Sequence, residues 1–451
     1  MSSLHRRALA GGKTVSRKAR AKPESGLSSS NPSPNVSPGN SRAGSRANSL
    51  PGSRYASEDE YMSDHETDDV MRVDTNSIDG DEGAFGGETS NWAERLRDRV
   101  TELQDRKRSN LQGRVKSLTA YNFLLEHNFA QRQLDQSVAE LLPLFLKLIQ
   151  GGSEEERSQA LQAFTLTILT CGSDTVFEEA LPILEEACYD AETQENKAEA
   201  LRALCIAVIQ GGGSQDAAKD LLEYLLAIIE SDGESVNALD SGPVVTAALQ
   251  GWAFVASHLS DLTFQQGAAI EAFEEQLNSS DAGVQTGAGV NIALLFEWAR
   301  EYEEETGESP DMQYNQHRTT TRMEEIVRDS SKSVSKKDRR NVRSKLSSVL
   351  TSLERGKGPG YSTAGRQGPN PHTGGARTED EGDFHEFGYR ERIRIYNQFL
   401  LINTWSLEAR VEMLKALLKG GFGIHYLENP LVREILSGAE VEFVSERRPK
   451  K

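Results

Sequence analysis

The chain has 451 residues, with 51 lysines and arginines against 69 aspartates and glutamates, a formal net charge of −18. A mean hydropathy of −0.56 is low for a chain that is globular throughout, so we expect part of it to be disordered. No apolar run approaches the roughly 18 residues that a membrane span needs, and the first residues lack the apolar core of a secretory signal. These features argue against a membrane protein and a secreted protein.

Residues 1–90 are predicted to form a disordered tail whose charge changes sign part-way. Residues 1–54 contain ten lysines and arginines and one acid, whereas residues 55–90 contain twelve acids and one arginine. Both parts are rich in Ser, Gly, Pro and Asn and carry almost no periodic aliphatic residues. They cannot bury enough apolar surface to offset the entropy cost of ordering.

The tail also carries candidate phosphorylation sites, in and just after its basic part. Three serines follow an arginine at Arg-x-x-Ser spacing and two precede a proline; together they are Ser45, Ser49, Ser57, Ser33 and Ser37. Ser49 is the sharpest case, because Arg46-x-x-Ser49-x-Pro51 resembles sites read by adaptors that clamp phosphoserine with arginines. A phosphoserine-binding adaptor is therefore a candidate partner.

The same tail carries a candidate targeting signal. The basic cluster at residues 17–22 lies on chain predicted to be disordered, where a nuclear import receptor can read it. The rival interpretation is a mitochondrial presequence, since residues 1–23 contain no acid, but Gly11, Gly12 and Pro23 interrupt the helix that it requires. We expect the protein in the nucleus and the cytoplasm.

The composition changes at Trp92, after which apolar residues recur at intervals of three and four, the period of amphipathic helices. The segment beginning at Ser153 recurs forty residues later at Thr193, and looser copies follow near residues 247 and 288. Seven pairs of small or apolar residues coincide in the first two copies: Ala160/Ala200, Leu161/Leu201, Ala163/Ala203, Phe164/Leu204, Leu166/Ile206, Ile168/Val208 and Gly172/Gly212.

This repeat predicts the fold. A two-helix unit of about 40 to 47 residues is the period of HEAT and armadillo repeats, so we expect an all-α, armadillo- or HEAT-like α-solenoid over residues 91–355. Ser153 with Glu156 forms a predicted capping box at one helix start, and Gly172 and Gly212 are placed as helix stops. Such a stack leaves an extended surface that normally holds a protein or a peptide. We therefore expect protein complexes on that surface and no small-molecule substrate.

No constellation of catalytic or metal-ligating residues stands out. Cys171, Cys188 and Cys205 lie seventeen residues apart, so no CxxC pair exists and the cysteines are expected to be small buried hydrophobes. The glycines at 420–423 lack the features of a phosphate loop, and the nearby His425 is interpreted as structural. We predict that the protein is not an enzyme and holds no metal and no cofactor.

The strongest local charge signal follows the repeat, where residues 328–345 carry eight basic residues and two aspartates. Clustered Lys and Arg release counterions when they meet phosphate, whereas the absence of interleaved aromatics argues against base stacking. The candidate nucleic-acid- or ribosome-binding residues are Arg328, Lys332, Lys336, Lys337, Arg339, Arg340, Arg343 and Lys345. The alternative is a solvated helix that pairs with the acidic repeats.

Three further segments complete the predicted organisation. Residues 356–383 contain eight glycines and three prolines, which predicts a flexible linker. Residues 384–438 are expected to form a small C-terminal helical unit, and residues 439–451 a charged tail.

The basic segment and the C-terminal unit together resemble a known family, the interferon-related developmental regulators. Its Ser-Lys-Lys-Asp-Arg block followed by Arg-Ser stands here at residues 335–339 and 343–344, and residues 103–108 resemble its opening signature with the basic order inverted. After Arg-Ser the family usually has Phe-Arg-Asp, where this chain has Leu-Ser-Ser. The family's tryptophan segment, Gly…His…Asn segment and closing helix correspond here to Trp405, Gly421, His425, Asn429 and Arg433.

The resemblance implies a non-enzymatic regulator of gene expression. Members of that family are described as transcriptional co-regulators that join corepressor complexes, and also as proteins that associate with ribosomes and dampen translation. The leading hypothesis is a scaffold that co-regulates transcription through protein partners. The alternatives are a factor that binds ribosomal subunits through ribosomal RNA, and an armadillo-type transport or assembly adaptor.

Overall fold

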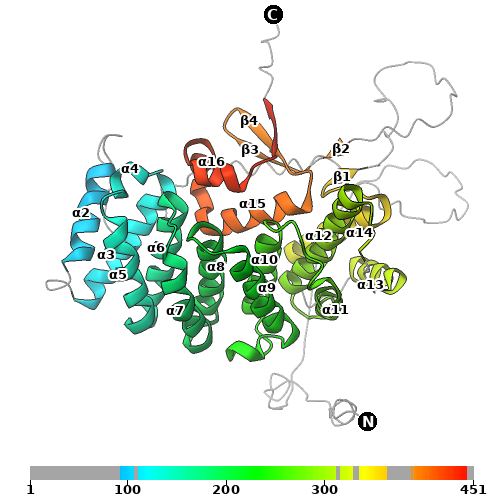
Figure 1. Ribbon diagram of the computed structural model, residues 1–451, viewed down its shortest axis with the longest axis horizontal. Helices are drawn as coiled ribbons and strands as arrows, with labels where there is room; N and C mark the ends of the chain where they lie inside the picture. Colours follow the sequence, from blue (N-terminus) through cyan, green and yellow to red (C-terminus); the bar gives the residue numbers. More distant parts are fainter. Residues whose placement is uncertain are drawn as a thin grey trace, which may run out of the picture. The chain divides into compact units, whose positions relative to one another are not determined.

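The structure is a computed structural model that describes residues 92–105, 110–310, 315–328, 335–362, 388–389 and 391–443. The predicted tail at 1–90, most of the predicted linker and the last residues of the chain lie outside these ranges. Within them, helices stacked in tandem make up most of the chain, which confirms the prediction of an all-α solenoid (Figure 1).

The helices of the repeat form two layers. Those of the inner layer pack each against the next, and each helix of the outer layer packs against one of them. The inner layer consists of α3 (Leu111–His127), α6 (Glu154–Cys171), α8 (Gln194–Gln210), α10 (Gly242–Ala256), α12 (Ala282–Thr306) and α14 (Lys336–Arg355). The outer layer consists of α2 (Trp92–Gln104), α5 (Val138–Gly151), α7 (Val176–Asp190), α9 (Gln215–Glu230), α11 (Gln266–Gln276) and α13 (Gln316–Arg328), with α4 (Gln131–Leu134) and η4 (Glu234–Val236) between helices.

Local signals in the sequence set the helix ends. Ser153 accepts from the N–H of Glu156, whose carboxylate accepts from the N–H of Ser153, so the predicted capping box is present. Helix α6 stops at Gly172, where φ is +69°, and α8 stops beside Gly212, where φ is +92°. A Cβ at Gly212 would lie 2.2 Å from the Asp174 carbonyl oxygen, so both the backbone angle and the packing require glycine there.

The positions that the predicted repeat register pairs lie in the core of the stack. The paired positions Ala160/Ala200 and Leu161/Leu201 are at most 1% exposed. Alanine at such positions lets neighbouring helix axes approach, and α6 packs closely along α8. The hydrophobic core is continuous from Leu96 in α2 to Leu436 in the C-terminal segment.

The C-terminal unit, predicted to be helical, also contains strands. Strands β3 (Arg392–Ile395), β4 (Gln398–Leu401) and β5 (Glu440–Phe443) form an antiparallel sheet in the order β3-β4-β5, and β1 (Tyr361–Ser362) pairs with β2 (Gly388–Tyr389). Strand β5 lies in the stretch expected to be a charged tail. Four-residue strands carry too little period-two pattern to be recognised, and the partner of β5 lies about forty residues earlier in the chain.

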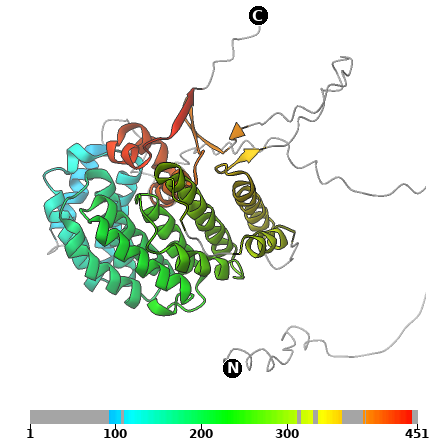
Figure 2. The ribbon, with the colours of Figure 1, turned by 45° about the vertical axis from the view of Figure 1, so that its right-hand side comes forward.

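The rest of this unit is helical and returns to the repeat. Helices α15 (Trp405–Leu418), η5 (Lys419–Gly421), α16 (Phe422–Glu428) and α17 (Pro430–Ile435) follow the hairpin of β3 and β4. We call residues 391–443 the C-terminal segment. Its helix α15 packs on α6, α10 and α12, its η5 packs on α3, and its α17 packs on α6 (Figures 1 and 2). The chain thus covers part of its own inner layer.

Candidate functional site

The residues singled out by the family resemblance hold the C-terminal segment on the repeat. Trp405 is fully buried at the start of α15, and its indole Nε1 donates to the Ser352 hydroxyl of α14 at 3.0 Å. Its backbone N–H donates to Glu297 of α12 at 2.9 Å, as does the N–H of Ser406. One carboxylate therefore caps the first turn of α15, where helix N–H groups have no partner within the helix.

His425 and Asn429 fasten the next turns to α3 and α6. The Nε2 of His425 lies 2.8 Å from the Leu125 carbonyl oxygen, and the Nδ2 of Asn429 lies 2.8 Å from that of Leu169. Burial lowers the pKa of His425, so the ring is neutral, with Nε2 donating to Leu125 and Nδ1 facing the Asn429 amide at 3.3 Å. The structural interpretation of His425 is confirmed, because its ring is wholly buried and both nitrogens are engaged.

Gly421 lies where the segment comes closest to α3. A Cβ at this position would be 1.6 Å from the Glu126 carbonyl oxygen, so only glycine fits. The neighbouring Gly420 is under no such constraint, since its Cβ would meet only the His127 ring at 3.6 Å. Arg433, the remaining residue of the family motif, is exposed on α17. The structure thus brings four of the five motif residues into the interface and leaves Arg433 in solvent.

The basic segment divides into an inward and an outward part. Lys345, a candidate nucleic-acid-binding residue, contacts two carboxylates of the C-terminal segment: Glu391, at 2.6 Å, and Glu408. Burial opposes its charge, but the attraction of both carboxylates raises the pKa of Lys345 above its ordinary value. Burial also raises the pKa of Glu408, one of whose oxygens has no hydrogen-bond partner. Lys345 therefore makes a structural ion pair within the chain, in contrast to the outward-facing role predicted from the sequence.

The outward part of the segment keeps its positive charge at the surface. Lys337, Arg340 and Arg343 are exposed on α14, and Arg343 Nε donates to the Val327 carbonyl oxygen of α13 at 3.0 Å. Arg328 is exposed and pairs with Glu324 one turn earlier at 2.8 Å. Arg339 is half-buried. We call Lys337, Arg340 and Arg343 the basic edge; Lys332 and the side chain of Lys336 lie outside the described residues, as do Ser33, Ser37, Ser45, Ser49 and Ser57.

Three residues that hold the C-terminal segment on the repeat were not predicted in that role from the sequence. They are Glu297, Arg410 and Lys345. Arg410 donates to the Ser257 hydroxyl at 3.1 Å and to the Ile435 carbonyl oxygen at 3.1 Å, which ties α10 to α17. For Lys345 a signal existed. It stands three residues after Val342 and four before Val349, both buried, so helical periodicity places it on the buried face of α14.

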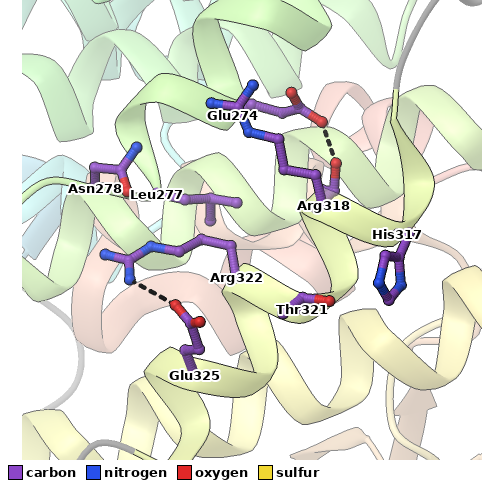
Figure 3. A pocket seen from close by; sticks show the side chains of 9 residues that line it. Glu274, Leu277, Asn278, His317, Arg318, Thr321, Arg322 and Glu325 are labelled. Carbon is purple, nitrogen blue, oxygen red and sulfur yellow. Dashed lines mark hydrogen bonds and ion pairs between the residues drawn. The ribbon is translucent and has the colours of Figure 1, made fainter.

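Cavities and thiols offer little chemistry within the described ranges. A cavity of about 290 Å³ lies between α11 and α13, and Figure 3 shows Arg322 turned to Glu325 at 3.1 Å on one side of it. On the other side Glu274 accepts from the Thr319 hydroxyl, so the two carboxylates of the cavity are engaged separately. The cysteines are buried or half-buried, and burial raises the pKa of Cys205 to about 12, as expected of small hydrophobes. No cluster of metal-ligating residues occurs in these ranges, and none of their helices is long and apolar enough to span a bilayer.

Comparison with known proteins places this architecture in a family. The model of the interferon-related developmental regulator (IFRD) family matches residues 62–354, more than half of the chain. The chain belongs to the IFRD family. It is similar to an uncharacterized protein of Schizosaccharomyces pombe, with 25% identity over 418 residues that cover 86% of this chain and 85% of that one. It is also similar to interferon-related developmental regulator 2 of Mus musculus, with 26% identity over 381 residues, or 78% and 76% of the two chains.

The IFRD match ends at residue 354, near the end of α14. The docking residues Trp405, Gly421, His425 and Asn429 lie beyond it, so their role rests on the contacts described above. Membership in the IFRD family supports a regulatory role of the kind that the family's name describes.

Proposed function

We propose that this IFRD-family protein regulates gene expression without catalysing a reaction, as a scaffold that co-regulates transcription by holding protein partners on its outer layer. The observation that carries the proposal is the docking of the C-terminal segment. It covers part of the inner layer and uses Glu297, Lys345 and His425 for structural contacts. The outer layer, in contrast, presents exposed acids to solvent.

The outer layer presents acids in a continuous series of helices. Helices α7, α9 and α11 contain one base, Lys219, whose Nζ lies 5.4 Å from the centre of the Phe264 ring. We call their exposed acids the acidic ridge: Glu178, Glu179, Glu186, Asp190, Asp216, Asp220, Glu223, Glu230, Glu271 and Glu275. A ridge of one charge steers and selects an oppositely charged partner, so the partner is a protein with a basic surface.

Charge reversal on the ridge tests this proposal. Glu178→Lys with Glu223→Lys should remove the protein from a nuclear protein complex on a sucrose gradient, and ribonuclease should leave the wild-type complex intact. The matched control, Lys337→Glu with Arg340→Glu on the basic edge, should co-sediment like the wild type. The scaffold proposal fails if the ridge variant sediments unchanged.

The basic edge supports a second candidate, a factor that binds ribosomal RNA and dampens translation. Three exposed bases within two turns of α14 can release counterions on meeting phosphate. Lys337→Glu with Arg340→Glu should then weaken co-sedimentation with ribosomal subunits and flatten its salt dependence, without changing the thermal melt. Unchanged co-sedimentation would leave the edge as a solvated face.

Localisation and tail regulation belong to the same proposal. The basic cluster at 17–22 supports nuclear and cytoplasmic location, and fusing residues 1–30 to a fluorescent protein tests it, since a mitochondrial pattern would contradict both candidate functions. A phosphoserine-binding adaptor is proposed for Ser49. A phosphopeptide covering residues 42–55 that fails to bind such an adaptor would end that part of the proposal.

A further inference from the structure

The three-stranded sheet ends in a strand that nothing in the described part of the chain covers. Strand β5 is the last in the order β3-β4-β5, and all four of its residues are exposed. An edge strand offers its unpaired N–H and C=O groups to any further strand, and folds commonly shield such edges. The edge of β5 is therefore a place where another chain can add to the sheet.

The register shows which backbone groups point outward. Ile395 pairs with Gln398 across the two-residue turn at 396–397, and Ile402 N–H donates to the Glu391 carbonyl oxygen at 2.9 Å. Hydrogen-bonded pairs alternate along an antiparallel ladder. The backbone N–H and C=O groups of Gln398 and Leu400 therefore bond to β3, and those of Phe399 and Leu401 bond to β5. Glu440 and Glu442 consequently bond to β4, while the N–H and C=O groups of Val441 and Phe443 face the open edge.

The open edge is apolar on one side. Phe443 lies opposite Gln398, and Val441 lies opposite the fully buried Leu400, so both side chains share the side of the sheet that packs on the helices. Yet Phe443 is 74% exposed and Val441 36%, because β5 extends beyond that cover. On the other side of the sheet, Glu440 and Glu442 are exposed.

We infer that β5 is a docking edge that binds an extended peptide as a fourth strand, and that Val441 and Phe443 bury its apolar side chains. The chemistry of the peptide follows from the two sides of β5. Residues opposite Val441 and Phe443 must be apolar, and residues opposite Glu440 and Glu442 must be basic, because side chains of directly opposed residues meet. The ligand is thus a segment in which apolar and basic residues alternate.

A second copy of this chain does not meet that requirement. Two β5 strands that pair antiparallel through their open edges place Val441 opposite either Val441 or Phe443 of the other copy. The first register sets Glu440 against Glu442, and the second sets Glu442 against itself. Like charges directly opposite each other destabilise a strand pair.

Synthetic peptides and the full chain test the inference by fluorescence anisotropy. A labelled nine-residue peptide of alternating valine and lysine should bind, and the same peptide with glutamate in place of lysine should bind at least tenfold more weakly. N-methylation at alternate residues of the first peptide, which blocks its backbone donors, should also weaken binding at least tenfold. Equal binding of all three peptides would overturn the inference.

Variants of the protein separate backbone pairing from side-chain contact. Val441→Pro removes one outward N–H and should weaken binding about tenfold, whereas Val441→Ala keeps that donor and should stay within about threefold. Phe443→Ala should weaken binding about tenfold, because it removes an exposed aromatic side chain that the peptide would bury. If the Val441→Pro protein binds the peptide as tightly as the Val441→Ala protein does, strand addition is excluded.

Two further outcomes assign the peptide elsewhere. The double variant of the acidic ridge, Glu178→Lys with Glu223→Lys, should bind the peptide as the wild type does. Loss of peptide binding in this variant would place the peptide on the ridge and overturn the inference. The docking edge does not depend on the scaffold proposal, so either can fail alone. Light scattering could instead show a concentration-dependent dimer of the wild type that Val441→Pro abolishes. That result would identify a second copy of the chain as the occupant of the edge and would overturn the inference.

Discussion

The carboxylate of Glu297 in α12 receives the backbone N–H of Trp405 at 2.9 Å, 108 residues further along the chain. With the N–H of Ser406 on its other oxygen, this buried group fixes where α15 begins on the inner layer. Two opposing effects meet at this point. Burial disfavours the charged form, whereas the two N–H donors favour it.

Burial prevails in the balance at Glu297 and raises its pKa to about 7, from an ordinary value of 4.5. Between about pH 4.5 and 7 the folded state therefore keeps a proton on Glu297 that the unfolded state releases. The contribution of Glu297 to the unfolding free energy consequently falls as the pH rises through that window, and it is constant above it. We expect the unfolding free energy of the wild type, minus that of Glu297→Gln, to fall by roughly 3 kcal/mol from pH 4 to pH 8.

Urea unfolding of both proteins at several pH values measures that difference, and subtraction removes the titration of Glu408, Glu301 and the other acids that the two share. A difference that rises with pH would show that the N–H donors outweigh burial.

Gly421→Ala should detach the C-terminal segment from α3. The added methyl group would lie 1.6 Å from the Glu126 carbonyl oxygen, so backbone must move, at a cost on the order of 3 kcal/mol. Gly420→Ala is the matched control and should cost less than about 1 kcal/mol. Equal melting temperatures of the two variants would contradict the close approach described for η5.

Asn429→Ala should loosen α16 and α17. It removes the donor to the Leu169 carbonyl oxygen and the acceptor that caps Leu431 N–H at 2.9 Å, for a combined cost of about 2–4 kcal/mol. Limited proteolysis followed by mass spectrometry should show earlier cleavage after residue 420 than in Arg433→Ala, whose side chain is exposed. Identical cleavage rates would mean that Asn429 does not hold the segment.

Leu201→Asp should cost more than about 4 kcal/mol, because it places an unpaired charge at a fully buried repeat position. Ala227→Asp, at an exposed position of α9, should cost less than about 1 kcal/mol by helix propensity alone. Circular dichroism melts of the two variants make the comparison. A wild-type melting temperature for Leu201→Asp would mean that the repeat register is wrong.

Lys345→Met should leave Glu391 and Glu408 without their shared cation and cost about 3–5 kcal/mol at pH 7. The deficit should shrink toward pH 5, since burial raises the pKa of Glu408, whose carboxyl can then take up a proton and lose its unpaired charge. Denaturant titrations at the two pH values test this. A deficit that is the same at both would argue against an ion pair.

The repeat could be predicted from the sequence and the docking could not, for a physical reason. Helical periodicity and capping are local, so the register of Leu161 with Leu201 and the box at Ser153 follow from nearby residues. The partners of His425 and Asn429 are backbone carbonyls 300 and 260 residues away, and any residue type can supply a carbonyl. The motif pointed to important residues, but nothing in their identity indicated that their partners lie within the same chain.

The return of α16 and α17 to α3 and α6 has a consequence for synthesis. An open stack of repeats can complete each unit as it leaves the ribosome, because each touches only its neighbours. Here Leu125 emerges 300 residues before the ring that binds it, a delay of roughly 15 to 60 s at ordinary elongation rates. For that time the surface of α3 and α6 that η5, α16 and α17 later cover stays open, and a nascent chain of this kind is exposed to wrong contacts until residues 419–435 arrive.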